Sequence, residues 1–179
     1  MLTITSGKYK NLTLYLPPEN ITRPISQKVR AAVFNSLAHK VVDSCTLDLY
    51  AGSGAMSIEA ISRGARVATL VDNNFKSISA IKKNIQKLNA KENISVINMD
   101  INKYLSNCRD KFDVIIIDPP YSELDIDVVN QASNLLQYGG VIVVSRSVKT
   151  ELNGLSKKLQ LYSTKVYGDS QIDFIKNLS

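Results

Sequence analysis

Four short apolar runs in the first two-thirds of the chain each end at or close to an aspartate. The runs are rich in Val, Ile and Leu and are bounded by turn residues, which is typical of strands buried on both faces. Helical patterns separate them, and alternating strands and helices favour a parallel sheet. The carboxyl ends of parallel strands share one edge, where open α/β folds bind ligands, so the acids are predicted to gather there. The runs are residues 46–50, 67–71, 94–98 and 112–117, and the acids are Asp48, Asp72, Asp100 and Asp118.

The last run ends in an unusual tetrapeptide, Asp118-Pro119-Pro120-Tyr121. Proline has no N–H and keeps the residue before it out of the helical region, so Asp118 and Pro119 are predicted to stay extended. A carboxylate and a backbone carbonyl then stand beside an aromatic ring. This combination suits a planar substrate with an exocyclic amino group, whose N–H bonds are accepted while its ring stacks on Tyr121. The alternative is a plain strand-ending turn in which Tyr121 only packs.

A glycine turn follows the first run and leads into a helix predicted for residues 55–63. Strand, glycine turn and helix form the first half of a nucleotide-binding unit, in which glycines let the backbone approach a ligand closely. Ser57 stands where a dinucleotide fingerprint needs a third glycine, and no P-loop Lys-Ser/Thr pair is present. A pyrophosphate is therefore not the obvious ligand, and a lone G-x-G is weak evidence by itself. The turn consists of Tyr50, Ala51, Gly52, Ser53 and Gly54.

The two middle acids differ in what they predict. Asp72 lies 18 residues beyond Gly54, where a carboxylate commonly binds the two hydroxyls of a ribose. Asp100 has a competing explanation, because an acid after a strand is often the N-cap of a helix. Four acids on one edge, with glycines after the first and two prolines after the last, nevertheless favour one shared site over coincidence.

These motifs, in this order and spacing, resemble the motif series of class I S-adenosylmethionine (SAM)-dependent amino-methyltransferases. The flanking segments are similar to bacterial 16S ribosomal RNA guanine-N2 methyltransferases of the RsmD type. Two positions depart from that pattern: Ile25 stands where the group has Thr after Arg-Pro, and Ser145-Arg146 ends a strand where it often has an acid. The segments that carry the resemblance are 7–10, 23–24, 28–30, 34–35, 48–55, 59–60, 62–65, Asp72, Asp100 and 118–121.

The resemblance implies a Rossmann-like α/β fold with a seven-stranded mixed sheet flanked by helices, SAM as the cofactor, and guanine N2 in 16S ribosomal RNA as the target. It places Gly52 and Gly54 under the methionine portion of SAM and Asp48 near its ammonium group. The catalytic residues expected are Asp118, Pro119, Pro120 and Tyr121. The cofactor-binding residues expected are Asp48, Tyr50, Ala51, Gly52, Ser53 and Gly54, then Asp72 and Asn73 for the ribose, and Asp100 and Ile101 for the adenine.

Nearly all of the net charge of +6 lies at the start of the chain. Residues 1–40 hold six basic side chains against Glu19 alone, and a basic segment beside an acidic small-molecule site indicates a polyanionic substrate. The resemblance implies that this substrate is 16S ribosomal RNA, either free or in an assembling small ribosomal subunit. The alternative is a solvated arm without a special role. The RNA-binding residues expected are Lys8, Lys10, Arg23, Lys28 and Arg30.

The pattern predicts a basic hairpin extension over residues 1–25 and a methyltransferase domain over residues 26–179. Strands are expected at 2–5 and 12–16, and Ser26 is expected to cap a helix that reaches about Ala38. Helix 75–89 carries an apolar stripe, helix 125–137 precedes Gly139-Gly140 and a strand at 141–145, and residues 160–175 form a closing hairpin.

Composition points to one intracellular domain with no metal site. Cys45 and Cys108 lack metal-ligand spacing, no apolar run approaches the length of a membrane span, and the first four residues are no signal peptide. A cytoplasmic monomer is expected. Other functions share some features: a nicotinamide-dependent reductase, a non-catalytic RNA-binding protein, and a DNA adenine-N6 or protein glutamine methyltransferase. Residues 118–121 alone do not separate the methyltransferases.

Overall fold

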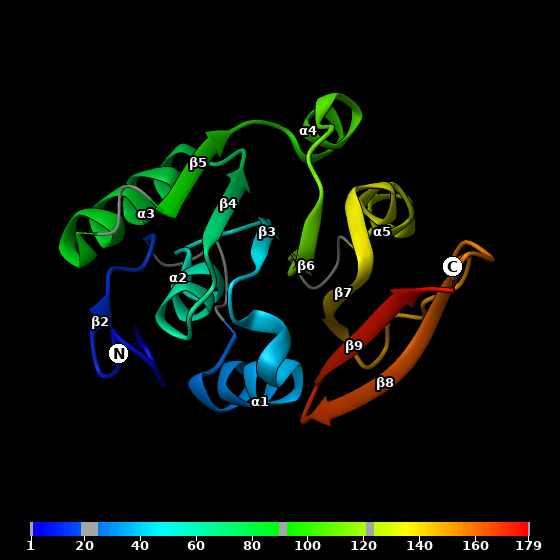
Figure 1. Cartoon of the computed structure of the whole chain (residues 1–179), viewed down its shortest axis with the longest axis horizontal. Coiled ribbons are helices and arrows are strands. Elements are labelled where there is room, and N and C mark those ends of the chain that lie inside the picture. The colour runs from blue at the N-terminus through cyan, green and yellow to red at the C-terminus, as the bar shows by residue number, and fades with distance from the viewer. Residues whose placement is uncertain (1, 19–24, 90–92, 121–123, 179) are drawn as a thin grey trace.

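The computed structural model describes residues 2–18, 25–89, 93–120 and 124–178. This part of the chain holds a small N-terminal sheet and a seven-stranded sheet with helices on both faces (Figure 1). The helices are α1 (Gln27–Leu37), α2 (Ala55–Ser62), α3 (Phe75–Leu88), α4 (Ile101–Asn107) and α5 (Ile126–Ala132), with 3₁₀ turns at Ala38–Val41 and Ser133–Leu135. The strands are β1 (Leu2–Thr3), β2 (Thr13–Leu14), β3 (Cys45–Leu49), β4 (Val67–Asp72), β5 (Ile94–Asn98), β6 (Phe112–Ile117), β7 (Leu136–Ser147), β8 (Leu159–Tyr167) and β9 (Ser170–Asn177).

The large sheet has the strand order β5-β4-β3-β6-β7-β9-β8. Strands β3 to β7 pair in parallel, whereas β9 pairs antiparallel with both β7 and β8, so the predicted mixed sheet and closing hairpin are confirmed. The chain winds from β3 out to β5 and then returns to β6 on the other side of β3. The order of strands therefore reverses between β3 and β6, and ligands bind at such a point in open α/β sheets.

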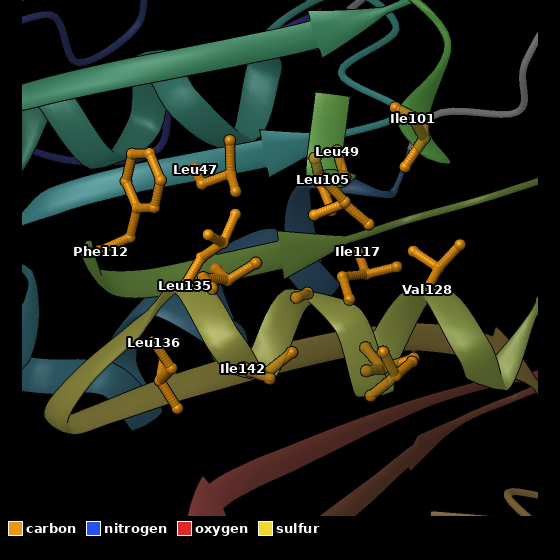
Figure 2. Close-up of a cluster of buried hydrophobic side chains, with 14 of the residues drawn as sticks. Leu47, Leu49, Ile101, Leu105, Phe112, Ile117, Val128, Leu135, Leu136 and Ile142 are labelled. Atoms are coloured by element: carbon orange, nitrogen blue, oxygen red, sulfur yellow. The ribbon is translucent and has the colours of Figure 1, made fainter. Parts of the chain in front are cut away.

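The strands alternate their side chains between two helical layers. Ile115 and Ile117 of β6 face α4 and α5, where they join the cluster that Figure 2 shows between these helices and the sheet. Val114 and Ile116 face the opposite layer, where they pack with side chains of α1 and α2. Burial on both faces explains why the central strands are continuous apolar runs.

The N-terminal hairpin packs against the main domain. Leu2 pairs with Leu14, which confirms the predicted hairpin in a shorter form. Leu2 and Leu14 are buried in one cluster with Ile78 and Ile81, part of the predicted apolar stripe of α3. In Figure 1 the hairpin lies beside α2 and α3, away from β8 and β9. Residues 2–18 thus share a core with these helices. The division of the chain after residue 25 stays a prediction.

The predicted helix 125–137 is wrong at its C-terminal end. Helix α5 ends at Ala132, and Leu136 already pairs with Phe112 of β6. The register then shifts through a bulge, so that Val114 pairs with Val141. Gly140 lies inside this bulge, where an added Cβ would come within 2.8 Å of the Asp113 carbonyl oxygen. Pairing with β6 extends the strand towards its N-terminus, which no local pattern in residues 133–140 announces.

Candidate active site

The glycine turn after β3 has a backbone that few residues adopt. Tyr50, Gly52 and Gly54 have positive φ values of 64°, 56° and 76°. For Tyr50 this left-handed conformation costs about 1 kcal/mol or more, and such strain concentrates at functional sites. Gly54 packs tightly, since an added Cβ would lie 3.0 Å from the Leu70 side chain and 3.3 Å from the Ile81 side chain. The turn is thus held tightly on the layer below it, with its backbone at the sheet edge.

Asp48 is buried behind this turn and is bonded to the helix that follows it. Its Oδ2 accepts hydrogen bonds from Ser57 Oγ at 2.8 Å and from Ser57 N at 3.3 Å. Burial and the charges of Asp118 and Asp72 together raise the pKa of Asp48 to about 7, against the Ser57 hydrogen bonds. The three carboxyl groups therefore lie near one another.

Asp72, the last residue of β4, ties its strand to the glycine turn. Its Oδ2 accepts from Gly52 N at 2.8 Å and its Oδ1 from Asn74 N at 2.7 Å. Burial raises its pKa, while the backbone donors of Asn74 and Gly52 and the nearby Ser77 hydroxyl lower it. A carboxylate offers about four acceptor positions, so this group keeps capacity for at least one further hydroxyl donor. Asn73, the next residue, is exposed at the same edge.

Asp118 stands directly after β6, beside the end of β3. Its N–H donates to the Leu49 carbonyl oxygen at 3.4 Å, so the backbone of Asp118 lies next to the start of the glycine turn. Burial raises the pKa of Asp118 to about 6, opposed by a hydrogen bond with the Ser145 side chain. Pro119 is buried and Pro120 half-buried, whereas Tyr121 lies outside the described residues.

Asp100 has the capping role that was its alternative explanation. It is the N-cap of α4, and its Oδ1 accepts from Lys103 N at 3.0 Å. The side chain of Ile101 is 4% exposed and belongs to the cluster shared with α5. Asp100 itself is exposed at the end of β5, on the edge that carries Asp72. A contact of these two residues with an adenine stays a prediction.

The predicted RNA-binding residues divide into two groups. Lys8, Lys10 and Lys28 are exposed, as an RNA contact requires, and Arg23 lies outside the described residues. The prediction that Arg30 contacts RNA is wrong, because its side chain is fully buried and forms an ion pair with Glu59 at 3.2 Å. A second donor of Arg30 binds the Thr3 carbonyl. Arg30 therefore holds the N-terminal segment and does not face a substrate.

Two serines of the site escaped the sequence interpretation. In the sequence Ser57 only replaces the third glycine of a dinucleotide fingerprint, but in the structure it supplies two donors to Asp48. In the sequence Ser145 is only a departure from a family pattern, but in the structure its side chain lowers the pKa of Asp118. Both serines stand where the sequence departs from an expected motif, and this departure is the signal in the sequence that could have identified them.

Neither a membrane-spanning helix nor a group of three or more possible metal ligands occurs in the described part of the chain. The longest helix there, α3, is too short and too polar to cross a bilayer.

Three comparisons with known proteins agree with this architecture. The family described as Conserved hypothetical protein 95 matches residues 2–176. "Ribosomal RNA small subunit methyltransferase D" of Escherichia coli K12 is 30% identical over 173 residues, which cover 93% of this chain and 85% of that protein. The protein of the same name from Buchnera aphidicola of Acyrthosiphon pisum is 36% identical over 135 residues, covering 75% and 69% of the two chains.

A solved structure extends the likeness to the whole fold. YhhF of Escherichia coli superposes with a TM-score of 0.88 at 28% identity, covering 98% of this chain and 97% of that one. The predicted class I methyltransferase fold is confirmed.

Proposed function

The chain belongs to the Conserved hypothetical protein 95 family, that of the RsmD-type methyltransferases, and on this premise we propose that it methylates the exocyclic N2 of a guanine in 16S ribosomal RNA, with SAM as the methyl donor. The observation that carries the proposal is the position of Asp118. This residue is bonded through its backbone to the strand end that leads into the strained glycine turn, at the point where the strand order reverses.

The residues around the turn suit SAM chemically. Asp72 is bonded to Gly52 of the turn and retains acceptor capacity for a ribose hydroxyl. With a pKa of about 7, Asp48 is about half ionised at neutral pH, and its ionised form suits the ammonium group of the methionine portion. Gly52 and Gly54 keep the backbone free of side chains where the ligand would approach. Bound SAM would supply an activated methyl group on its sulfonium.

The protein's own contribution is to orient and polarise the amine. The lone pair of an exocyclic guanine amine is delocalised into the ring, so the amine is a weak nucleophile. Acceptance of its N–H bonds by Asp118 and the Pro119 carbonyl would favour the pyramidal, cationic nitrogen that develops during transfer. With a pKa of about 6, Asp118 is ionised at neutral pH and can take the proton that the product loses. Tyr121 is proposed to stack on the extruded base.

The substrate class follows from the family and the exposed lysines. Lys8, Lys10 and Lys28 would bind phosphates of the RNA, either free or in an assembling small subunit. Because ribosomes lie in the cytoplasm, the bacterial cytoplasm is the proposed location. The chain is proposed to act as a monomer.

The test is to identify the methylated product. The protein and SAM are incubated separately with unmethylated 16S ribosomal RNA, with small ribosomal subunits and with duplex DNA, and the digested nucleosides are analysed by mass spectrometry. N2-methylguanosine in a ribosomal sample is the expected result. N6-methyladenine in DNA together with unmodified guanine in both ribosomal samples would overturn the substrate. Binding of RNA without any methyl transfer would favour an RNA-binding protein on a methyltransferase scaffold.

A further inference from the structure

One fully buried amide on α3 joins two segments that are distant in sequence. Asn84 Oδ1 accepts from Tyr15 N at 2.7 Å, beside β2 of the N-terminal hairpin. Asn84 Nδ2 donates to the Tyr15 carbonyl and to the Ser53 carbonyl of the glycine turn, both at 2.9 Å. The amide thus binds the extension with one edge and the proposed cofactor turn with the remaining N–H.

Neighbouring contacts of α3 reinforce both connections. One turn before Asn84, Ile81 packs against Gly54, where an added Cβ would lie 3.3 Å from the Ile81 side chain. Three residues after Asn84, Lys87 donates to the Thr13 carbonyl at 2.7 Å and stands over the Tyr15 ring. One face of α3 therefore seats the glycine turn and the hairpin side by side.

The tip of the hairpin is held equally firmly by α2. Thr5 donates through its N–H and its hydroxyl to the two oxygens of Glu59, at 2.9 and 2.5 Å. Lys8 N donates to the Ser62 carbonyl at 2.8 Å. The exposed Lys8 side chain thus stands on a backbone that is bonded to the helix that follows the glycine turn.

We propose that Asn84 is a positioning residue that couples RNA binding to cofactor binding, an inference that rests on the proposed function. The two hydrogens of Asn84 Nδ2 bind two carbonyls, one in each segment. Displacement of either segment leaves a buried N–H without its partner, so an ordered turn favours a docked hairpin and the reverse. A ligand that orders one segment lowers the entropic cost of ordering the other, which produces positive cooperativity without a large structural change.

The experiment measures the affinity of the protein for an unmethylated 16S ribosomal RNA transcript with and without saturating S-adenosylhomocysteine. For the wild type, the cofactor product should tighten RNA binding by about 5-fold or more, and RNA should tighten its binding by the same factor. Asn84→Asp keeps the acceptor for Tyr15 N and removes both donors, so this ratio should fall to no change. Asn84→Ala, which leaves a small cavity in place of a buried charge, should lose the ratio as well.

The control is an asparagine that makes the same kind of bridge elsewhere. Asn130 of α5 donates to the Gly154 carbonyl at 3.0 Å and accepts from Ser156 N at 2.9 Å. Asn130→Asp should retain the wild-type ratio. Partial unfolding of a variant cannot mimic the loss of the ratio, because saturating S-adenosylhomocysteine would shift a partly unfolded variant to its folded state and would raise the ratio. Both affinities are therefore compared under conditions in which each variant is fully folded.

The outcomes separate the inference from the proposed function. A wild type that methylates the RNA but shows equal affinities with and without S-adenosylhomocysteine overturns the coupling alone. Retention of the ratio in both Asn84 variants, or its equal loss in Asn130→Asp, also overturns it. A wild type that binds neither ligand overturns the proposed function and the coupling with it.

Discussion

Replacement of Gly7 by alanine is expected to detach the hairpin tip from α2. Gly7 has a φ of 81°, and an added Cβ would lie 1.8 Å from the Ser62 carbonyl oxygen, which is backbone and cannot rotate away. The tip must move, and three hydrogen bonds to Ser62 are then lost: from Lys8 N at 2.8 Å, from Tyr9 N at 2.9 Å, and from Ser62 Oγ to the Ser6 carbonyl at 2.5 Å. At about 1 kcal/mol each, their loss costs about 3 kcal/mol.

A matched glycine separates this steric effect from the strain of the backbone itself. Gly168, at the tip of the β8–β9 hairpin, also has a positive φ, of 59°, but nothing lies within 4 Å of its added Cβ. Gly168→Ala should therefore cost only the left-handed strain, about 1–2 kcal/mol, which Gly7→Ala bears as well.

Urea denaturation would compare the free energies of unfolding of the two variants. Gly7→Ala should be less stable than Gly168→Ala by about 3 kcal/mol, or by about 6–12 °C in Tm for a chain of this size. Hydrogen exchange would detect a purely local release as faster exchange of the Lys8 and Tyr9 amides. Equal stability of the two variants with protected Lys8 and Tyr9 amides would refute the proposed docking.

Three further predictions concern the site. Asp118→Ala should reduce methyl transfer by orders of magnitude while the affinity for SAM stays within a few-fold of the wild type. Methyl transfer by the wild type should fall as the pH drops through about 6, where Asp118 becomes protonated. Kinetics at saturating SAM would check both. The pKa of Asp48 in the folded protein, about 7, lies above its ordinary value of 3.8. Its contribution to stability is therefore full below about pH 4 and is lost as the pH rises through 7. Between pH 5 and 8, Asp48→Asn should lose less stability than the wild type in urea denaturation. Lys8→Ala with Lys10→Ala should weaken RNA binding and reduce its salt dependence, measured by filter binding, and an equal loss from Lys82→Ala with Lys83→Ala would contradict this footprint.

The sequence predicted the elements whose signals are local. The buried strands, the glycine turn, the stripe of α3 and the closing hairpin follow from residue periodicity and turn chemistry within a few positions of each element. Their order also determined that Asp48, Asp72 and Asp118 meet at one edge, because parallel strands align their carboxyl ends. The docking of the hairpin onto α2 and α3 had no such local signal.

The end of α5 shows where local signals stop. Residues 133–137 fit a helix by pattern, but Leu136 pairs with Phe112, which is 24 positions away. Asp100 shows the same limit: its motif position and its capping position coincide, and only the structure shows that it caps α4.

The chain by itself thus determined which elements form and which acids share an edge, since both depend on neighbouring residues. Only the tertiary structure decided which polar side chains serve the substrate and which hold the fold. Arg30 lies in a basic segment, yet Glu59 and the Thr3 carbonyl enclose it. Asn84 lies on a helix rich in lysines, yet it binds Tyr15 and Ser53. Whether a polar group faces water or a partner depends on segments that folding brings next to it, and no local pattern records them.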